Sequence, residues 1–356
     1  MRVAFVKQAL DVFGPWRTLR WQDTTPRELF EVWPGKATYW EMTCCLEADW
    51  YIVPQQIVTG YTHDAILKHP GRPALTQKYT EKIVDPEEIP FGDYDLVVSF
   101  DPVLAPRQGS STLFAYFAHE HWDAIYRKSL HMPVRNYDLF LAHMMDATIK
   151  LTALPQAVSF PYLRAPELAR SIFSVEKEEI AWVEWRTVAA LGMSEVWNES
   201  SEAAQKRLGQ ALGVPTRTNG SFNLNPYGIS DPPSWGDGAA YLTRLAGCRY
   251  FIAATAAGAG QSLCDAASLG CITIGVSELV YHRMLCHPEC LCEDLEELPK
   301  KFRRVAASHD LQREVLHWQD QKLREHFIES PLALLRTAVE KKSGLAQRPD
   351  MHLAHA

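Results

Sequence analysis

Short apolar segments recur along the chain and alternate with longer amphipathic stretches. Continuous apolar runs of this length are typical of strands that are buried on both faces of a parallel sheet, and the stretches between them have the length of helices. In the first half the predicted strands are Val3–Val6, Trp50–Val53, Leu96–Phe100, Leu113–Phe117 and Leu139–Ala142, and the predicted helices include Thr25–Val32 and Ala37–Leu46. This alternation predicts an α/β domain with a parallel sheet.

The second half repeats the alternation. Gln156–Pro166 is expected to close the first sheet, because proline donates no N–H and continues neither a ladder nor a helix interior. We therefore predict a first domain at residues 1–168, a second at 169–343 and a flexible tail at 344–356. The elements predicted in the second domain are the strands Ile180–Val188, Tyr250–Thr255 and Cys271–Val276, the helices Trp197–Leu212, Asp237–Ala246 and Ser262–Leu269, and a helical stretch from Leu295 to about Lys342 with breaks near Ser308 and Pro331.

Composition excludes several classes of protein. The 356 residues are 47% hydrophobic and 22% charged, which excludes global disorder. A formal net charge of −7 argues against a protein that binds nucleic acid or anionic lipid through its overall charge. No apolar run approaches the roughly 20 residues of a membrane span, and the first residues do not resemble a signal peptide. We expect a cytoplasmic protein with reduced cysteines and no integral membrane span, for which peripheral association with a membrane stays open.

The segment Tyr250–Val276 carries the most chemistry. A buried strand is expected to end at Thr255, and Gly258 and Gly260 then allow a tight turn and a close approach of the backbone to a ligand. The helix that follows exposes N–H groups in its first turn, and this end of a helix attracts phosphate.

Three side chains of that helix are candidates for a nucleotide site. Gln261 and Ser262 stand in its first turn, and Asp265 lies one turn further on, where a carboxylate can reach a ribose diol beside a bound phosphate. A plain strand–turn–helix, with glycines present for packing, is the alternative.

The same residues resemble a pattern of glycosyltransferases of the GT-B architecture, E-G-F-G-x-x-x-x-E-A-x-x-x-G-x-P-V-I. The corresponding residues are Ala257 to Ala266 and Gly270 to Ile274, in which both glycines, the second acidic position (Asp265) and the following Ala and Gly fit. Ala257 departs from the pattern at the first Glu, which is associated with the donor sugar or phosphate in retaining enzymes. An inverting or a retaining outcome is therefore left open.

The resemblance implies a fold and a function. GT-B enzymes have two Rossmann-like domains that face a cleft, with C-terminal helices that often cross back. Asp265 would bind the ribose of a nucleotide sugar, and Arg186, at the end of the second domain's first predicted strand, would bind its diphosphate. A surface or salt-bridged arginine is the alternative for Arg186. Tyr227 is a candidate to stack on the base, or part of an ordinary surface loop.

In the first domain, the candidates lie where predicted strands end. His119, Glu120 and His121 follow the strand Leu113–Phe117, where a Glu or His is placed to act as general base on an acceptor hydroxyl. A His that hydrogen-bonds the sugar, or a structural role for the three residues, is the alternative. Asp101 is a candidate base or a turn residue, and Gly14–Trp16 is a candidate contact for an acceptor sugar.

We predict no metal site. Neighbouring residues of His119–His121 point in different directions, and Cys286, His287, Cys290 and Cys292 lack the two separated pairs of a structural zinc site.

The sequence thus predicts a metal-independent glycosyltransferase that moves a sugar from a nucleotide-sugar donor to a hydroxyl acceptor, with glycan or surface-polysaccharide synthesis as its expected setting. The nucleotide sugar is a co-substrate, and no cofactor is expected. A non-hydrolysing nucleotide-sugar epimerase and a non-catalytic two-domain ligand-binding protein are the alternatives. The donor sugar, the base, the acceptor and the oligomeric state are left open.

Overall fold

The computed structural model describes residues 1–8, 20–26, 37–53, 88–100, 110–118, 137–143, 157–183, 210–217, 238–253, 261–277, 280–293 and 296–346. The chain divides into two compact units. The first unit contains Met1–His143, Ile149–Tyr162 and Glu329–Ala356, and the second contains Met144–Thr148 and Leu163–Ile328.

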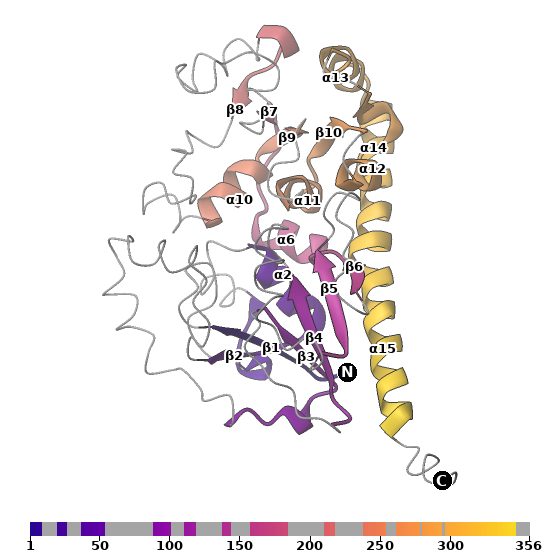
Figure 1. The fold of residues 1–356 in the computed structure, drawn as a ribbon. Helices are drawn as coiled ribbons and strands as arrows, with labels where there is room; N and C mark the ends of the chain where they lie inside the picture. Colours follow the sequence, from indigo (N-terminus) through magenta and orange to yellow (C-terminus); the bar gives the residue numbers. More distant parts are fainter. Residues whose placement is uncertain are drawn as a thin grey trace, which may run out of the picture. The chain divides into compact units, whose positions relative to one another are not determined.

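A parallel sheet forms the centre of the first unit, with the strand order β2-β1-β3-β4-β5-β6 (Figure 1). The strands are β1 (Val3–Gln8), β2 (Asp49–Val53), β3 (Leu96–Ser99), β4 (Leu113–Ala118), β5 (Leu139–His143) and β6 (Ala157–Phe160). Every strand predicted in this half is confirmed to within two residues at either end, except that β6 is confined to the first half of Gln156–Pro166. The residues of β3 are all buried, as the continuous apolar runs predict.

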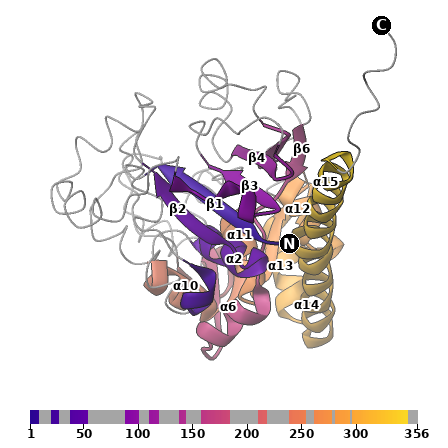
Figure 2. The ribbon, with the colours of Figure 1, turned by 90° about the horizontal axis from the view of Figure 1, so that it is seen from below.

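Aromatic side chains fill one face of this sheet. The ring of Trp50 stacks on Phe100 with 5.2 Å between centroids, and Phe5 meets both rings edge to face. Helix α2 (Ala37–Leu46) lies against the sheet (Figure 2). It covers this cluster through Tyr39, whose ring centroid lies 5.8 Å from that of Trp50. The helix is held to the sheet by these large apolar contacts, which contribute about 2–3 kcal/mol for each ring that is fully buried.

At the edge of the same sheet where the strands begin, a network of polar side chains holds Arg20 and Trp21, which precede α2 in the sequence. Asp49 accepts hydrogen bonds from the side chain of Arg20 at 2.8 Å, from the main-chain N–H of Trp21 at 2.8 Å and from Tyr94 at 2.6 Å. The hydroxyl of Tyr51 lies 2.7 Å from that of Tyr94. Burial and these hydrogen bonds raise the pKa of Tyr94, so the phenol stays protonated and donates to Asp49.

The second unit has its own parallel sheet, with the order β11-β10-β9-β7-β8. Its strands are β7 (Glu178–Val183), β8 (Thr216–Arg217), β9 (Cys248–Ala253), β10 (Ile272–Val276) and β11 (Leu291–Cys292). The predicted strands are confirmed within the described residues, outside which lie residues 184–188 of Ile180–Val188 and residues 254–255 of Tyr250–Thr255. The helices described in this unit are α6 (Pro166–Ile172), α10 (Gly238–Ala246), α11 (Gln261–Ser268), α12 (Val280–Leu285), α13 (Leu298–Ala306) and α14 (His309–Arg324).

The C-terminal helices begin and end close to the predicted breaks. Ser308 is the N-cap of α14, and its hydroxyl accepts a hydrogen bond from the N–H of Leu311 at 3.2 Å. Near Pro331 the helix does not stop. A π-helical turn at Glu325–Glu329 joins α14 to α15 (Ser330–Ala346), so the irregularity lies one turn before the proline.

Helix α15 belongs to the first unit, where it runs beside the sheet (Figure 1) and contacts β4. Lys342 of this helix donates to Asp138 at 2.6 Å. The predicted domains placed residues 329–343 in the second domain and the boundary after residue 168. The compact units instead separate at Tyr162 and Leu163, and the chain returns to the first unit at Glu329. The sequence pattern of a helix is the same whether the helix packs on the first unit or on the second. Only the packing of the apolar side of α15 therefore assigns this helix to a unit.

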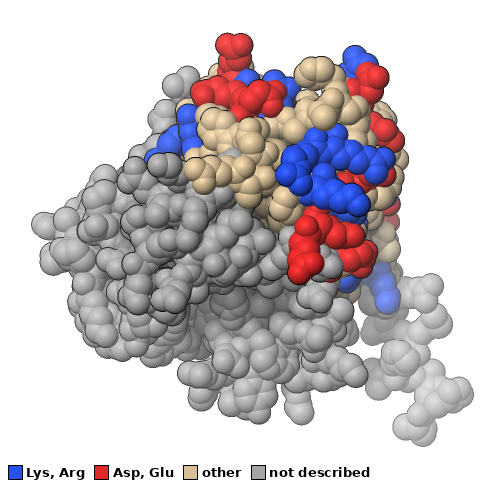
Figure 3. All heavy atoms as spheres, turned by 90° about the horizontal axis from the view of Figure 1, so that it is seen from above, with Lys and Arg blue, Asp and Glu red and all other residues tan. Residues whose placement is uncertain are grey.

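Basic and acidic side chains are mixed on the described surface. On the face that Figure 3 shows, Lys and Arg lie directly beside Asp and Glu. On α13, for example, Lys301 is 3.8 Å from Glu297 and Arg304 is 2.8 Å from Glu289. Such pairing cancels much of the local positive charge of this helix.

Candidate functional site

The candidate site lies at the carboxyl edge of the second sheet. β8 pairs with one side of β7 and β9 with the other, so the order of connection reverses between β7 and β9. In open parallel sheets, ligands bind outside the carboxyl ends of the strands at such a reversal. β9 ends there at Ala253, and the chain enters α11 at Gln261.

Helix α11 holds three of the predicted nucleotide-binding residues. Gln261 is its first residue, and Ser262 follows as a half-buried residue. Asp265 lies one turn further and is only 8% exposed. The prediction of a helix directly after the glycine segment is confirmed, so the N–H groups of the first turn are placed at the carboxyl edge of the sheet.

The carboxylate of Asp265 is held by Arg164. The guanidinium Nη1 of Arg164 donates to Oδ1 of Asp265 at 2.5 Å, and the two side chains are 1% and 10% exposed. Among the described residues, this is the one hydrogen bond that the carboxylate of Asp265 makes, and it leaves Oδ2 for another donor. Burial raises the pKa of Asp265, and the positive charge and hydrogen bond of Arg164 oppose that rise.

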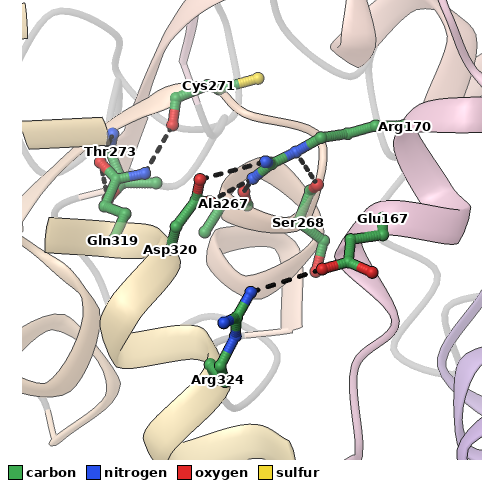
Figure 4. Close-up of polar contacts among 9 residues, drawn as sticks. All are labelled: Glu167, Arg170, Ala267, Ser268, Cys271, Thr273, Gln319, Asp320 and Arg324. Carbon is green, nitrogen blue, oxygen red and sulfur yellow. Dashed lines mark hydrogen bonds and ion pairs between the residues drawn. The ribbon is translucent and has the colours of Figure 1, made fainter. Parts of the chain in front are cut away.

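A separate cluster fixes the C-terminal end of α11 (Figure 4). Arg170, on α6, donates from Nε to the carbonyl of Ser268 at 2.9 Å and from Nη2 to that of Ala267 at 3.3 Å. These carbonyls belong to the last turn of the helix, after which no further helical turn supplies donors. The carbonyl of Ala267 also accepts from the main-chain N–H of Gly270 at 3.0 Å. Asp320 of α14 holds the same guanidinium at 2.5 Å and 3.2 Å, and Gly270 ends the turn at a φ of +73°.

At the start of strand β10, which follows α11, the side chain of Gln319 makes the main-chain hydrogen bonds that a neighbouring strand would otherwise make. β10 pairs with β11 only at Gly275 and Val276. Further back along β10, Gln319 of α14 accepts from the N–H of Thr273 at 2.9 Å and donates to the carbonyl of Cys271 at 2.8 Å (Figure 4). Its amide thus makes the two bonds that a residue of a parallel strand would make opposite Ile272.

The end of β10 is packed against α12 through a buried histidine. Nδ1 of His282 accepts from the N–H of Val276 at 2.9 Å, and burial lowers the pKa of His282 to about 4, so the ring is neutral at pH 7. The close contact requires Gly275, because a Cβ there would lie 2.4 Å from His282 Nδ1.

Most of the other predicted site residues lie outside the described residues. These are His119, Glu120, His121, Arg186, Tyr227, Gly258 and Gly260, together with Asp101 and Gly14–Trp16. Their predicted roles stay predictions. Of the proposed nucleotide contacts, the structure places Gln261, Ser262 and Asp265 together on α11.

Two buried basic residues were not among the predicted site residues. Arg164 stands between the apolar residues and prolines of the predicted domain junction, and a buried arginine in such a segment needs an anionic partner. Lys7, at the carboxyl end of β1, has no exposed area and lies over the rings of Tyr39 and Phe100, at 5.6 Å and 6.0 Å from Nζ to the centroids. The signal for both is a charged residue within an apolar run.

The cysteines near His287 are part of the core. Cys286, Cys290 and Cys292 are buried thiols, and burial raises the pKa of Cys286 to about 12. His287 is the N-cap of the short helix Pro288–Cys290, and its Nδ1 accepts from Glu289 N–H. Within the described part of the chain, no group of three or more His, Cys, Asp or Glu side chains is arranged to hold a metal ion.

In the same described part, none of the helices combines the length and the apolar composition that crossing a bilayer requires.

Comparison with known proteins gives a match in structure and none in sequence. No protein-family model matches the chain, and no curated protein matches its sequence. Among solved structures, an α-glucosyltransferase in complex with UDP and a 13-mer DNA containing an HMU base is similar with a TM-score of 0.51 and 11% identity, over 96% of this chain and 99% of that chain. The fold is that of the GT-B glycosyltransferases.

Two further structures align over nearly the whole chain, with TM-scores below 0.5. Sucrose-phosphate synthase (tll1590) from Thermosynechococcus elongatus has a TM-score of 0.48 and 10% identity, with 97% of this chain and 100% of that chain covered. Anabaena Alr3699/HepE in complex with UDP and glucose has a TM-score of 0.46 and 11% identity, with 98% and 99% covered. The two parallel sheets and the likeness to the α-glucosyltransferase confirm the predicted α/β class with two Rossmann-like domains of the GT-B type.

Proposed function

We propose that this protein is a glycosyltransferase that moves a sugar from a nucleotide-sugar donor to a hydroxyl acceptor. One observation carries the proposal: β9 ends and helix α11, with Asp265, begins at the reversal point of the second sheet of a GT-B fold, and the sequence that joins them contains Gly258 and Gly260. The first turn of α11 offers main-chain N–H groups to the diphosphate, and Asp265 offers a carboxylate oxygen to the ribose.

In the proposed reaction, the bond between the anomeric carbon and the diphosphate oxygen breaks, and a bond from the acceptor oxygen to that carbon forms. The acceptor's proton passes to a base, for which Glu120, His119 and His121 are the candidates. The charge that develops on the leaving diphosphate is stabilised by the end of α11 and by Arg186. We propose that these groups suffice without a bound metal ion.

The first experiment measures binding of UDP, GDP and ADP to the full chain by isothermal titration calorimetry. We expect one of them to bind, and Asp265→Asn to weaken that binding about tenfold or more, because the amide both loses the charge and turns an N–H toward the ribose. Asp320→Asn is the matched control, since Asp320 is 47% exposed and contacts Arg170 at the far end of α11. Failure of all three diphosphates to bind would overturn the proposal.

The second experiment measures turnover. The sugar nucleotides of the diphosphate that binds are incubated with and without a panel of hydroxyl acceptors, and the products are separated by chromatography. A glycosyltransferase releases the nucleoside diphosphate faster when an acceptor is present. An epimeric sugar nucleotide formed without acceptor would instead identify an epimerase, and tight binding with no product would identify a ligand-binding protein.

A further inference from the structure

The residue that holds Asp265 comes from the segment in which the chain enters the second unit. The long segment of that unit, Leu163–Ile328, begins at Leu163, and Arg164 is the next residue. Its partner Asp265 lies 101 residues further along the chain. The ion pair therefore ties helix α11, which carries the candidate nucleotide site, to the connection between β6 and α6.

The main chain of Arg164 is fixed at the same point. Its N–H donates to the carbonyl of Phe327 at 3.2 Å, inside the π-helical turn Glu325–Glu329. In a regular α-helix that carbonyl would accept from the N–H four residues later, but residue 331 is a proline and has none. The proline thus leaves the Phe327 carbonyl for Arg164. The ring of Phe327 is fully buried, and its centroid lies 5.6 Å from that of Tyr281, so packing holds the residue that binds the N–H of Arg164.

The burial of this pair is costly. Removing an arginine and an aspartate from water costs several kcal/mol for each ion, and apolar side chains of similar volume often serve a fold equally well. Arg164 is 1% exposed and engages Asp265 through Oδ1, at 2.5 Å. A carboxylate that is held at one oxygen and open at the other is suited to accept hydrogen bonds from a diol.

We propose that Arg164 is a positioning residue for the donor nucleotide, which holds the Asp265 carboxylate with Oδ2 turned toward the ribose hydroxyls. This inference rests on the proposed function. Because its guanidinium is buried, Arg164 acts through Asp265 and does not itself contact the nucleotide. Its effect is therefore confined to the ribose, while the diphosphate is bound by other groups.

The test compares two ligands that differ only in the ribose hydroxyls. Affinities for UDP and 2′,3′-dideoxy-UDP are measured by calorimetry, or for the corresponding GDP or ADP pair if that diphosphate is the one that binds. For the unmodified protein we expect a preference of about 10- to 100-fold for the ribonucleotide, which is the range for charge-assisted hydrogen bonds. In Arg164→Gln the preference should fall to within about threefold, with the affinity for the dideoxy compound almost unchanged.

Two variants keep the test decisive. Arg164→Lys retains a positive charge beside Asp265 with a single point donor, so it should fold and should restore part of the preference even if Arg164→Gln is unstable. Arg170→Gln is the matched control, because Arg170, on α6, contacts the other end of α11 and does not contact Asp265. It should keep the full preference for the ribonucleotide.

The outcomes separate the two proposals. If the unmodified protein binds none of the diphosphates, the proposed function fails and this inference fails with it. Three outcomes refute the role of Arg164 while the proposed function stands. The unmodified protein binds the ribonucleotide and the dideoxynucleotide equally, Arg164→Gln keeps the preference for the ribonucleotide, or Arg164→Gln loses affinity for both nucleotides to the same extent.

Discussion

The amide of Gln319 replaces a missing strand, and removing it should destabilise the second unit. In Gln319→Leu, the N–H of Thr273 and the carbonyl of Cys271 lose their partners at 2.9 Å and 2.8 Å. Both residues have no exposed area, and Gln319 is 1% exposed, so water does not replace the lost bonds without local opening. Leucine has a similar volume and keeps the packing against β10.

The expected cost follows from these two groups. A buried donor or acceptor that is left without a partner costs about 1–3 kcal/mol, so the pair should cost about 2–6 kcal/mol. The added apolar surface of leucine offsets about 1 kcal/mol of this. We therefore expect the free energy of unfolding of the second unit to fall by about 1–5 kcal/mol.

The assay combines denaturant unfolding with hydrogen exchange. The unfolding midpoint of Gln319→Leu is compared with that of Gln321→Leu, which makes the same change at an exposed position two residues along α14. Exchange measured on a peptide that covers β10 should show lost protection in Gln319→Leu and normal protection in the control. If Gln319→Leu unfolds within about 0.5 kcal/mol of Gln321→Leu, the reasoning that the amide acts as a strand is refuted.

Three further predictions concern single positions. The pKa of His282 is about 4 in the folded protein, so the unfolded chain binds this proton first as the pH falls below 6.5. The free energy of unfolding should therefore drop by about 1.4 kcal/mol per pH unit between pH 6.5 and 4. Urea titrations of His282→Gln should lack this pH dependence. Gly270→Ala should lower the free energy of unfolding by about 1–2 kcal/mol, because Gly270 has a φ of +73°. Gly344→Ala should raise it by about 1 kcal/mol, because Gly344 lies in α15 with open space around it. Equal denaturant midpoints for the two variants would contradict this prediction. Ser308→Ala should cost about 1 kcal/mol through loss of the α14 N-cap, and an unchanged melting temperature would argue against the cap.

The sequence by itself determined the elements and their class. Runs such as Leu96–Ser99 and Ile272–Val276 are apolar at every position or nearly so, and only strands covered on both faces bury such runs completely. Gly270 marked the end of α11, and Ser308 marked the start of α14, because turn and cap chemistry acts over a few neighbouring residues. For the same reason, the order of strand, glycine segment and helix was enough to assign Asp265 to the carboxyl edge of the second sheet.

Tertiary structure alone decided which distant residues meet. Arg164 and Asp265 are 101 residues apart, and Gln319 and Thr273 are 46 apart, so no local pattern links them. The assignment of α15 to the first unit has the same cause, since Lys342 and Asp138 are 204 residues apart. Periodicity shows that a helix has an apolar side, but only the folded chain determines the surface against which that side packs.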